Sequence, residues 1–153
     1  MATISKKIVS LVFTALLAAG IMGNGFASSA RAADPTGNWR LSSGKITVRI
    51  NYCGGQNVCA TIVAMAKPLN KLGKPKTDKD NPNPALRSRP VIGLQVVSGM
   101  TPDGENRWKG KIYNADDGGT YKATAEVSGN TLVIKACGLG GLACKKRVFT
   151  RTN

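Results

Sequence analysis

Two stretches of this 153-residue sequence alternate apolar and polar residues with a period of two, and this pattern constrains the fold more than any other feature. In "RWKGKIY", residues 107–113, one face of an extended chain carries Trp108, Gly110 and Ile112. In "TYKATAEV", residues 120–127, the same alternation groups Tyr121, Ala123, Ala125 and Val127. Since successive side chains of a strand point to opposite faces, both stretches predict antiparallel strands with one buried face.

Six further strands are predicted, and turn sequences separate them. The segments lie at residues 38–41, 45–51, 60–65, 91–97, 131–136 and 145–151. The connections "TPDGEN", "DDGGT" and "SGN" contain glycine and are typical of turns between neighbouring antiparallel strands. No segment has a helical period. The sequence therefore predicts an all-β chain that forms one small antiparallel up-and-down barrel of about eight strands, filled by side chains or holding one small ligand.

The first 32 residues predict a cleaved secretory signal peptide. Lys6 and Lys7 precede an apolar run, and the pattern Ala30-Arg31-Ala32 predicts cleavage before Ala33. An uncleaved membrane anchor is the alternative, although the apolar run is short for a membrane span. The barrel domain is expected to be residues 33–153, in the periplasm or secreted, with no later stretch long enough to cross a membrane.

The mature chain is strongly basic. Removal of Lys6, Lys7 and Arg31 leaves 19 basic residues and 8 acidic residues, a net charge of +11. This charge favours anionic partners, and in an exported protein we expect envelope lipid or lipopolysaccharide rather than nucleic acid. The alternative is that the charge only keeps the domain soluble.

Four cysteines remain after cleavage, in "CGGQNVC" (Cys53 and Cys59) and "CGLGGLAC" (Cys137 and Cys144). Export makes disulfides the expected state, and three pairings are possible. We favour the two local pairs, because each glycine-containing interval can turn back on itself. A four-cysteine zinc site is the alternative, but neither spacing matches the short pairs that such sites use. No metal site and no cofactor are predicted.

About 25 residues between Met65 and Val91 have neither strand nor helix signals, and a loop of this length is usually functional or disordered. Its lysine-rich first half is expected to be a mobile tether, whereas the proline-rich second half, from Asp80 and Asn81 onward, is expected to be ordered. In an extended chain, Arg87 and Arg89 would face the same side and could capture an anion. Alternatively, Asp78 or Asp80 pairs with one arginine and fastens the loop over the end of the barrel.

Catalysis has little support in the sequence. There is no histidine, which removes the commonest general base. Asp116 and Asp117 precede two glycines and are typical of a hairpin turn rather than an acid/base pair. We expect no catalytic residues and no enzymatic activity.

Two resemblances follow from these segments. Gly37 and Trp39 lie in "GNW" at the start of the first strand, and Arg151 lies at the end of the last. In lipocalin-like (calycin) barrels, such residues close one end, with the basic side chain packed over the indole. More broadly, "GNW", "ITVRINYCGGQNVCATIV", "DKDNPNPALRSRPVIGL", "WKGKIYNADDGGTYKATAEV", "LVIKACG" and "VFTR" resemble the secreted bacterial family called domain of unknown function 2147. Departures are Phe149, where the family often has tryptophan, and the lysine-rich linker. The resemblance implies a periplasmic lipocalin-like barrel with no assigned activity.

The sequence thus predicts a non-enzymatic binding protein for a small apolar or amphipathic ligand. Its expected ligand-binding residues are Arg87, Arg89, Asn81, Asp80, Trp108 and Tyr121, although the two aromatic residues could instead pack in the core. Small inward residues, among them Gly110 and Ala125, favour space inside the barrel unless Trp108 fills it. The alternative is an envelope interaction protein that binds anionic lipid or lipopolysaccharide through basic residues such as Arg107, Lys109 and Lys111.

Overall fold

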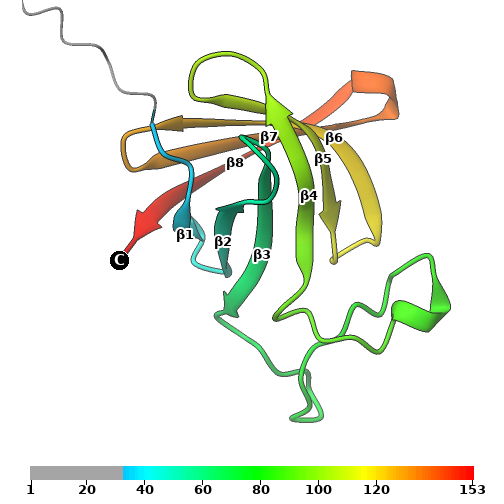
Figure 1. Ribbon diagram of the computed structural model, residues 1–153. Coiled ribbons are helices and arrows are strands. Elements are labelled where there is room, and N and C mark those ends of the chain that lie inside the picture. The colour runs from blue at the N-terminus through cyan, green and yellow to red at the C-terminus, as the bar shows by residue number, and fades with distance from the viewer. Residues whose placement is uncertain (1–32) are drawn as a thin grey trace, which may run out of the picture. The chain divides into compact units, whose positions relative to one another are not determined.

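The protein forms one closed antiparallel barrel in the computed structural model, which describes residues 33–153 (Figure 1). The strands are β1 (Gly37–Leu41), β2 (Ile46–Tyr52), β3 (Val58–Met65), β4 (Gln95–Pro102), β5 (Arg107–Asn114), β6 (Gly119–Ser128), β7 (Thr131–Gly138) and β8 (Ala143–Thr152). Each strand pairs with the next in the chain, and β1 pairs with β8 to close the barrel. The prediction of an all-β, eight-stranded up-and-down barrel is confirmed.

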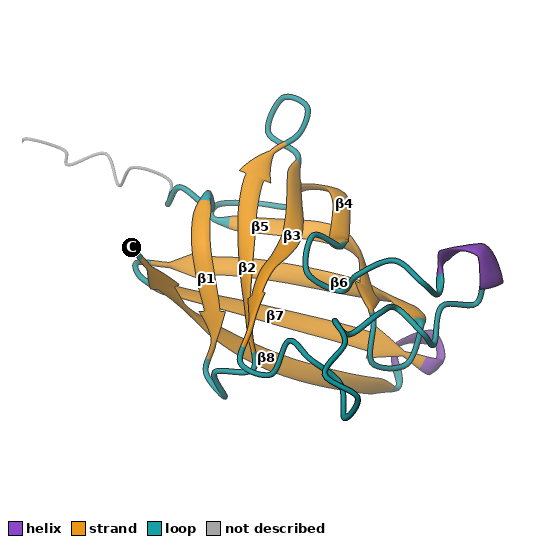
Figure 2. Ribbon diagram, turned by 90° about the horizontal axis from the view of Figure 1, so that it is seen from below, coloured by secondary structure: helices purple, strands orange, loops and turns teal. Residues whose placement is uncertain are grey.

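The two halves of the barrel cross one another. Figures 1 and 2 show β1–β3 running across the direction of β6–β8. The pairing of β2 with β3 shifts between Thr47 and Val48, and a shift of this kind bends a strand and helps a sheet to close. Helical structure in residues 33–153 is limited to the 3-10 turns η1 (Pro84–Leu86) and η2 (Leu139–Gly141). None of these described helices has the length and apolar character needed to span a membrane.

Large side chains fill one end of the barrel, which we call the closed end. It carries the β2–β3, β4–β5 and β6–β7 turns. Trp39 and Leu132 are completely buried there, and Val127 is nearly so. The indole N–H of Trp39 donates to the Pro35 carbonyl at 2.8 Å, and that of Trp108 donates to the Gln56 carbonyl at 3.2 Å. Burial of both indoles with their polar atoms satisfied makes this end a packed core.

The opposite end, which we call the open end, carries the β1–β2, β5–β6 and β7–β8 turns and the long β3–β4 connection, residues 66–94. This connection is ordered, and the prediction of a mobile tether in its first half is wrong. The Asn70 side chain accepts hydrogen bonds from the backbone N–H groups of Leu72 and Lys74, which fixes a tight turn. Thr77 and Pro90 form an antiparallel bridge, so the two halves of the connection hold each other.

One predicted strand begins later than expected. β4 starts at Gln95, whereas the sequence predicted a strand from Val91. The Leu94 N–H bonds to the Val91 carbonyl, and Gly93 has a φ of +93°, so residues 91–94 form a turn. Val91 and Leu94 are nevertheless buried, which explains why an apolar run there resembled a strand.

The structure joins the cysteines in two local disulfides, Cys53–Cys59 and Cys137–Cys144. The predicted local pairing is confirmed. The first bridge closes the β2–β3 turn at the closed end, and the second links β7 to β8, where the two cysteines are direct cross-strand partners. Each bridge therefore fixes a hairpin rather than joining distant parts of the barrel.

Candidate functional site

The barrel encloses a cavity of about 650 Å³. Its wall is apolar because it is built from the inward face of the alternating strands. Typical wall residues are Ile46, Ile62, Val97, Met100, Ile112 and Ile134. The closed-end residues Trp39, Trp108, Val127 and Leu132 are absent from the lining, which places them beneath its floor. Residues of the open-end turns complete the lining, so the cavity opens at that end. Its volume and apolar wall are typical of small-molecule sites.

Small inward residues leave the space for this cavity. Ala60, Ala125 and Ala136 line it, one each from β3, β6 and β7. Gly110 makes room for a neighbouring side chain rather than lining the cavity, since a Cβ at this position would lie 2.8 Å from the Cγ of Met100. Met100, rather than Trp108, therefore occupies the space beside Gly110.

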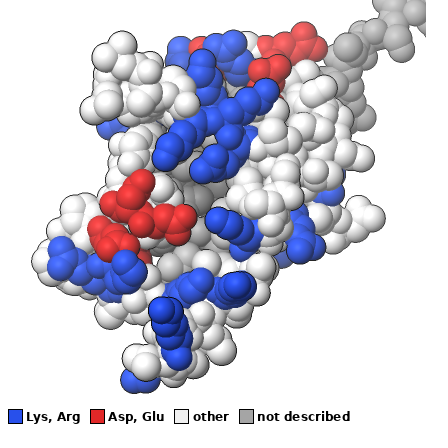
Figure 3. All heavy atoms as spheres, turned by 180° about the vertical axis from the view of Figure 1, so that it is seen from behind, with Lys and Arg blue, Asp and Glu red and all other residues white. Residues whose placement is uncertain are grey.

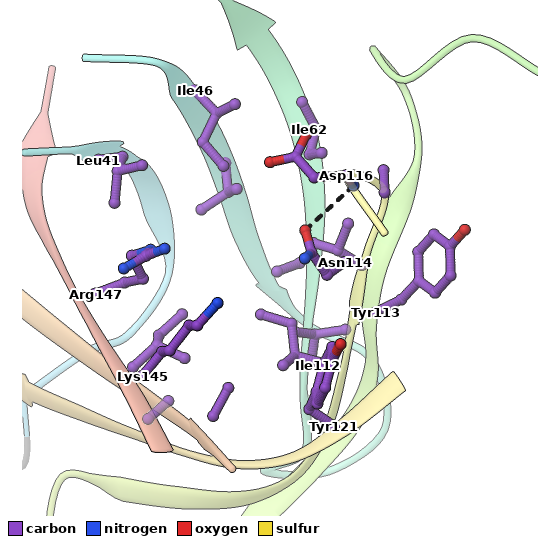
Figure 4. Close-up of a pocket in the computed structure, with 18 of the residues that line it drawn as sticks. Leu41, Ile46, Ile62, Ile112, Tyr113, Asn114, Asp116, Tyr121, Lys145 and Arg147 are labelled. Carbon is purple, nitrogen blue, oxygen red and sulfur yellow. Dashed lines mark hydrogen bonds between the residues drawn. The ribbon is translucent and has the colours of Figure 1, made fainter. Parts of the chain in front are cut away.

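The mouth of the cavity is polar and charged. Lys145 and Arg147 lie there on β8, directly opposite Ala136 and Ile134 of β7. Figure 4 shows Lys145 and Arg147 on one wall, and Asn114, Asp116 and Tyr121 on the other side of the opening. On one face of the molecule, Lys and Arg side chains gather over a large area, with smaller groups of acidic side chains (Figure 3). The site is therefore amphipathic, with an apolar interior and an ionic rim.

Asp117 is held in place on this rim by hydrogen bonds. Its carboxylate accepts hydrogen bonds from the Gly119 N–H at 2.8 Å, the Tyr121 hydroxyl at 2.9 Å and the Asn114 side-chain amide at 2.8 Å. Burial alone would raise the pKa of Asp117, but these hydrogen bonds, with a smaller effect of the Lys145 charge, lower it below its ordinary value. The hydrogen bond to Asp117, followed by burial, raises the pKa of the Tyr121 hydroxyl. The Asp117 carboxylate is thus ionised, and its hydrogen bonds are all made within the β5–β6 hairpin.

A second carboxylate, Asp78, anchors the 66–94 connection beside the cavity. It is completely buried. The Tyr113 hydroxyl donates to it at 2.6 Å, the Asn81 amide at 2.7 Å, and Arg89 at 2.8 and 2.9 Å through two nitrogens. Burial would raise the pKa of Asp78, but the hydrogen bonds from Tyr113, Asn81 and Arg89 together lower it. Because Tyr113 also lines the cavity, this cluster ties the connection to the cavity wall.

The β5–β6 turn supports the same anchor by close packing. Gly118 has a φ of +69°, and a Cβ there would lie only 1.8 Å from the Asp80 carbonyl oxygen. Only glycine can adopt this conformation so close to another backbone. The 66–94 connection and the β5–β6 turn are therefore fixed against each other at the open end.

Residues 37–151, which reach from β1 to β8, match one known protein family. These residues match the family described as "Uncharacterized protein conserved in bacteria (DUF2147)". The chain belongs to the DUF2147 family. The predicted resemblance is confirmed.

The structure of this DUF2147 protein is similar to that of a solved protein. Protein HP1028 from the human pathogen Helicobacter pylori, which belongs to the lipocalin family, matches with a TM-score of 0.66 and 26% sequence identity. The similarity covers 79% of this chain and 84% of HP1028. A search of curated proteins found no match. The lipocalin likeness favours a small-ligand binding protein over an enzyme.

The predicted site residues of the DUF2147 protein fall into separate groups. Gly37, Trp39 and Arg151 meet at the closed end, where the Arg151 guanidinium lies 4.2 Å from the centre of the Trp39 ring. A Cβ on Gly37 would lie 3.0 Å from an Arg151 nitrogen, so this close packing suits glycine. Of the six residues expected to bind ligand, only Tyr121 lines the cavity.

Arg87 and Arg89 lie outside the cavity lining and do not act as a pair. Residues 84–86 form a 3-10 turn and Arg87 has helical dihedral angles, so the extended conformation expected here is wrong. The Arg87 side chain donates to the Asn81 carbonyl at 2.8 Å, whereas Arg89 binds Asp78. The alternative reading, a loop fastened by Asp78 and one arginine, describes what the structure shows. Asp80 pairs with Lys79 on the surface.

Sequence reasoning missed the residues of the mouth, above all Lys145 and Arg147. A signal for them was present, because residues two and four positions before the buried Phe149 must face the same side of β8. Within residues 33–153, no group of three or more metal-binding side chains was found.

Proposed function

We propose that this protein is exported and binds a small amphipathic molecule inside its barrel. The observation that carries the proposal is the cavity of about 650 Å³, apolar within and charged at one mouth. Pockets that hold small molecules have this size and combine an apolar wall with a few polar groups that orient the ligand. The packed closed end leaves the open end as the entrance.

Export to the periplasm is the second part of the proposal. The signal peptide predicted for residues 1–32 lies outside the described residues. Support comes from the two disulfides, because such bonds persist in oxidising compartments.

Binding, rather than catalysis, is the activity that we infer. The adjacent residues Asp116 and Asp117 both serve the β5–β6 turn: the backbone N–H of Asp116 donates to the Asn114 side chain at 3.3 Å, and the Asp117 carboxylate accepts from the Gly119 N–H. A general acid or base needs a carboxyl that is free to exchange a proton with a substrate. Asp117 instead accepts three hydrogen bonds in its ionised form.

The test uses the neutral fluorescent probe N-phenyl-1-naphthylamine, whose emission rises in an apolar site. We expect the wild-type protein to bind the probe and Ala136→Phe to bind it much more weakly, because Ala136 lines the cavity. Its matched control is Lys135→Phe, one residue earlier on β7 and directed outward. Circular dichroism shows whether both variants are folded. Probe binding that survives in a folded Ala136→Phe variant would contradict the proposal, as would a wild-type protein that binds no probe.

A second candidate function rests on a different feature, a shallow outer groove of about 760 Å³ on β5–β8. Its basic residues are Arg107, Lys109, Lys111, Lys122, Lys135 and Lys146. Arg107 and Lys109 bind Asp103 at 3.1 and 2.8 Å, and the remaining lysines form no ion pair within the described part of the chain. The groove is therefore suited to an anionic lipid surface.

Sedimentation with vesicles that contain an anionic phospholipid tests this second function. We expect binding to fall steeply as salt rises, and to weaken in Lys111→Glu and Lys122→Glu variants. Binding that persists unchanged at high salt would refute it. The cavity proposal does not depend on this result.

A further inference from the structure

The inward face of β8 changes character along its length. Phe149 is buried in the core, whereas Arg147 and Lys145, the next two residues on the same face, are exposed at the cavity mouth. Their register partners on β7, Ile134 and Ala136, line the cavity. An alternating strand that encloses an apolar cavity would normally carry apolar side chains at these positions. Lys145 and Arg147 therefore place two positive charges where the apolar wall meets the opening.

These two cations have no ionic partner among residues 33–153. The four ion pairs of this part of the chain involve other basic residues. Arg147 makes one long hydrogen bond, 3.4 Å, to the carbonyl of Lys146. Lys145 acts on Asp117 only as a charge that helps to lower its pKa, and the Asp117 oxygens already accept hydrogen bonds from three other groups. The hydrogen-bonding capacity of both cations is thus available to a ligand.

The geometry points to an amphiphile with a single anionic headgroup as the ligand: we propose that Lys145 and Arg147 bind the headgroup while the apolar tail enters the barrel. This inference rests on the proposed function of the cavity. An apolar tail gains free energy by leaving water for the apolar interior. The guanidinium of Arg147 and the ammonium of Lys145 make charge-assisted hydrogen bonds to a carboxylate or a phosphate, roughly twice as strong as neutral ones.

The direction of binding follows from the two ends of the barrel. The floor consists of buried side chains above Trp39 and Leu132, where an ionised headgroup would lose its hydration without gaining a partner. At the mouth, a headgroup beside Arg147 stays partly hydrated. Asp116 lies across the opening from Lys145 and Arg147 of β8, so an anion is favoured on the β8 side of the rim.

The experiment compares three probes that separate the headgroup from the tail: dodecanoate, dodecanol and acetate. Each competes with N-phenyl-1-naphthylamine for the wild-type protein. We expect dodecanoate to bind about tenfold or more tightly than dodecanol, since a hydrogen bond to a charged group is worth about one to two powers of ten in affinity. We expect no competition by acetate, because it lacks a tail.

Variants assign this preference to named residues. In the Lys145→Met, Arg147→Met double variant, dodecanoate should bind no more tightly than dodecanol, while the affinity for dodecanol stays close to that of the wild type. The matched control is Lys146→Met, which removes a cation from the same strand on its outer face. Unchanged dodecanol binding shows that the double variant is folded, and near-UV circular dichroism checks this independently.

The outcomes separate this inference from the proposed function. Equal binding of dodecanoate and dodecanol by the wild type would overturn the headgroup inference and leave the cavity function standing. Failure of both to displace the bound probe would overturn the headgroup inference alone, whereas a wild-type protein that binds no probe would overturn the two together. Competition by acetate would show that an anion displaces the probe without any apolar tail, and retention of the preference in the double variant would assign it to other residues. Either result also overturns the inference.

Discussion

The two ends of β8 carry the same kind of residue on the same inward face, yet use it differently. At the closed end, Arg151 stacks on Trp39, donates to the Asp34 carbonyl at 2.6 Å and also donates to the Thr36 carbonyl. At the open end, Arg147 has a single long hydrogen bond to the backbone of its neighbour. The difference shows that the surroundings, and not the residue type, decide whether an inward cation stabilises the fold.

The segment before β1 supplies the hydrogen-bond acceptors for Arg151. Residues 33–36 pass over the closed end, and the Ala33 N–H donates to the Asn106 side chain in the β4–β5 turn. Their carbonyls satisfy both the Trp39 indole and the Arg151 guanidinium. Since a buried polar group is costly unless it is hydrogen-bonded, this segment completes the packed end. The contrast predicts that removal of Arg151 or its packing partner Trp39 affects stability, whereas removal of the mouth cations Lys145 and Arg147 affects binding.

The largest effect is expected from Trp39→Ala. Truncation of a completely buried indole should cost about 3–5 kcal/mol in the free energy of unfolding, because the packed side chains around Trp39 cannot move to fill the new space that the mutation leaves. Urea denaturation followed by circular dichroism measures the loss. Lys145→Ala at the open end should change the same quantity by less than about 0.5 kcal/mol. Similar losses in both variants would abolish the contrast between the two ends.

Asp78→Ala should have the next largest effect, about 2–3 kcal/mol, because it leaves Tyr113, Asn81 and Arg89 without their acceptor. Asp80→Ala is the matched control, since Asp80 forms only an exposed pair with Lys79, and should cost about 0.5 kcal/mol or less. A larger loss from Asp80→Ala than from Asp78→Ala would show that the connection is anchored in another way.

The Asp78 anchor also has a pH dependence of known sign. The folded pKa of Asp78 is lowered, so its contribution to stability is complete above the unfolded value of about 3.9 and is lost as the pH falls through the folded pKa. Urea denaturation at neutral and acid pH should therefore show a smaller acid-induced loss in Asp78→Asn than in the wild type. An equal loss in the two proteins would assign the acid sensitivity to other carboxylates.

A direct comparison of the two arginines sharpens the contrast. Arg151→Met removes the contact with the indole and the hydrogen bonds to two carbonyls, and should cost about 1–2 kcal/mol. Arg147→Met should cost less than about 0.5 kcal/mol, because it removes no strong contact. The midpoints of urea denaturation, measured for both variants and the wild type, compare the two losses of stability. The reverse order of losses would mean that the open end holds Arg147 more firmly than its hydrogen bonds indicate.

The fold could be predicted from sequence because its signal is local. Alternation in residues 107–127 identifies β5 and β6 without reference to the rest of the chain, and glycine turns limit the connections. The start of β4 could not be predicted in the same way. Val91 and Leu94 are buried by tertiary packing of the 66–94 connection, and burial of a turn gives the same apolar pattern as a strand.

The site was less predictable, for two physical reasons. The choice between Asp78 and Asp80 as the anchor depends on Tyr113, which lies 35 residues from Asp78 in the chain. The cations of the mouth were available to sequence reasoning but resemble a solvated basic run in "KKR". Counting by two from Phe149 separates Lys145 and Arg147, which face inward, from Lys146, which does not.

The smallest expected effect tests the geometry of the open mouth itself. If Lys145 faces Asp117 across the opening, removal of its charge in Lys145→Met should raise the pKa of Asp117 slightly toward its ordinary value. The hydrogen bonds from Gly119, Tyr121 and Asn114 remain, so most of the lowering should persist. NMR titration of the side-chain carboxyl carbon measures this, and Lys146→Met serves as the control because it faces the other side of β8. A shift in the control but not in Lys145→Met would reverse the inward and outward assignment on this strand, and with it the choice of residues that face the cavity.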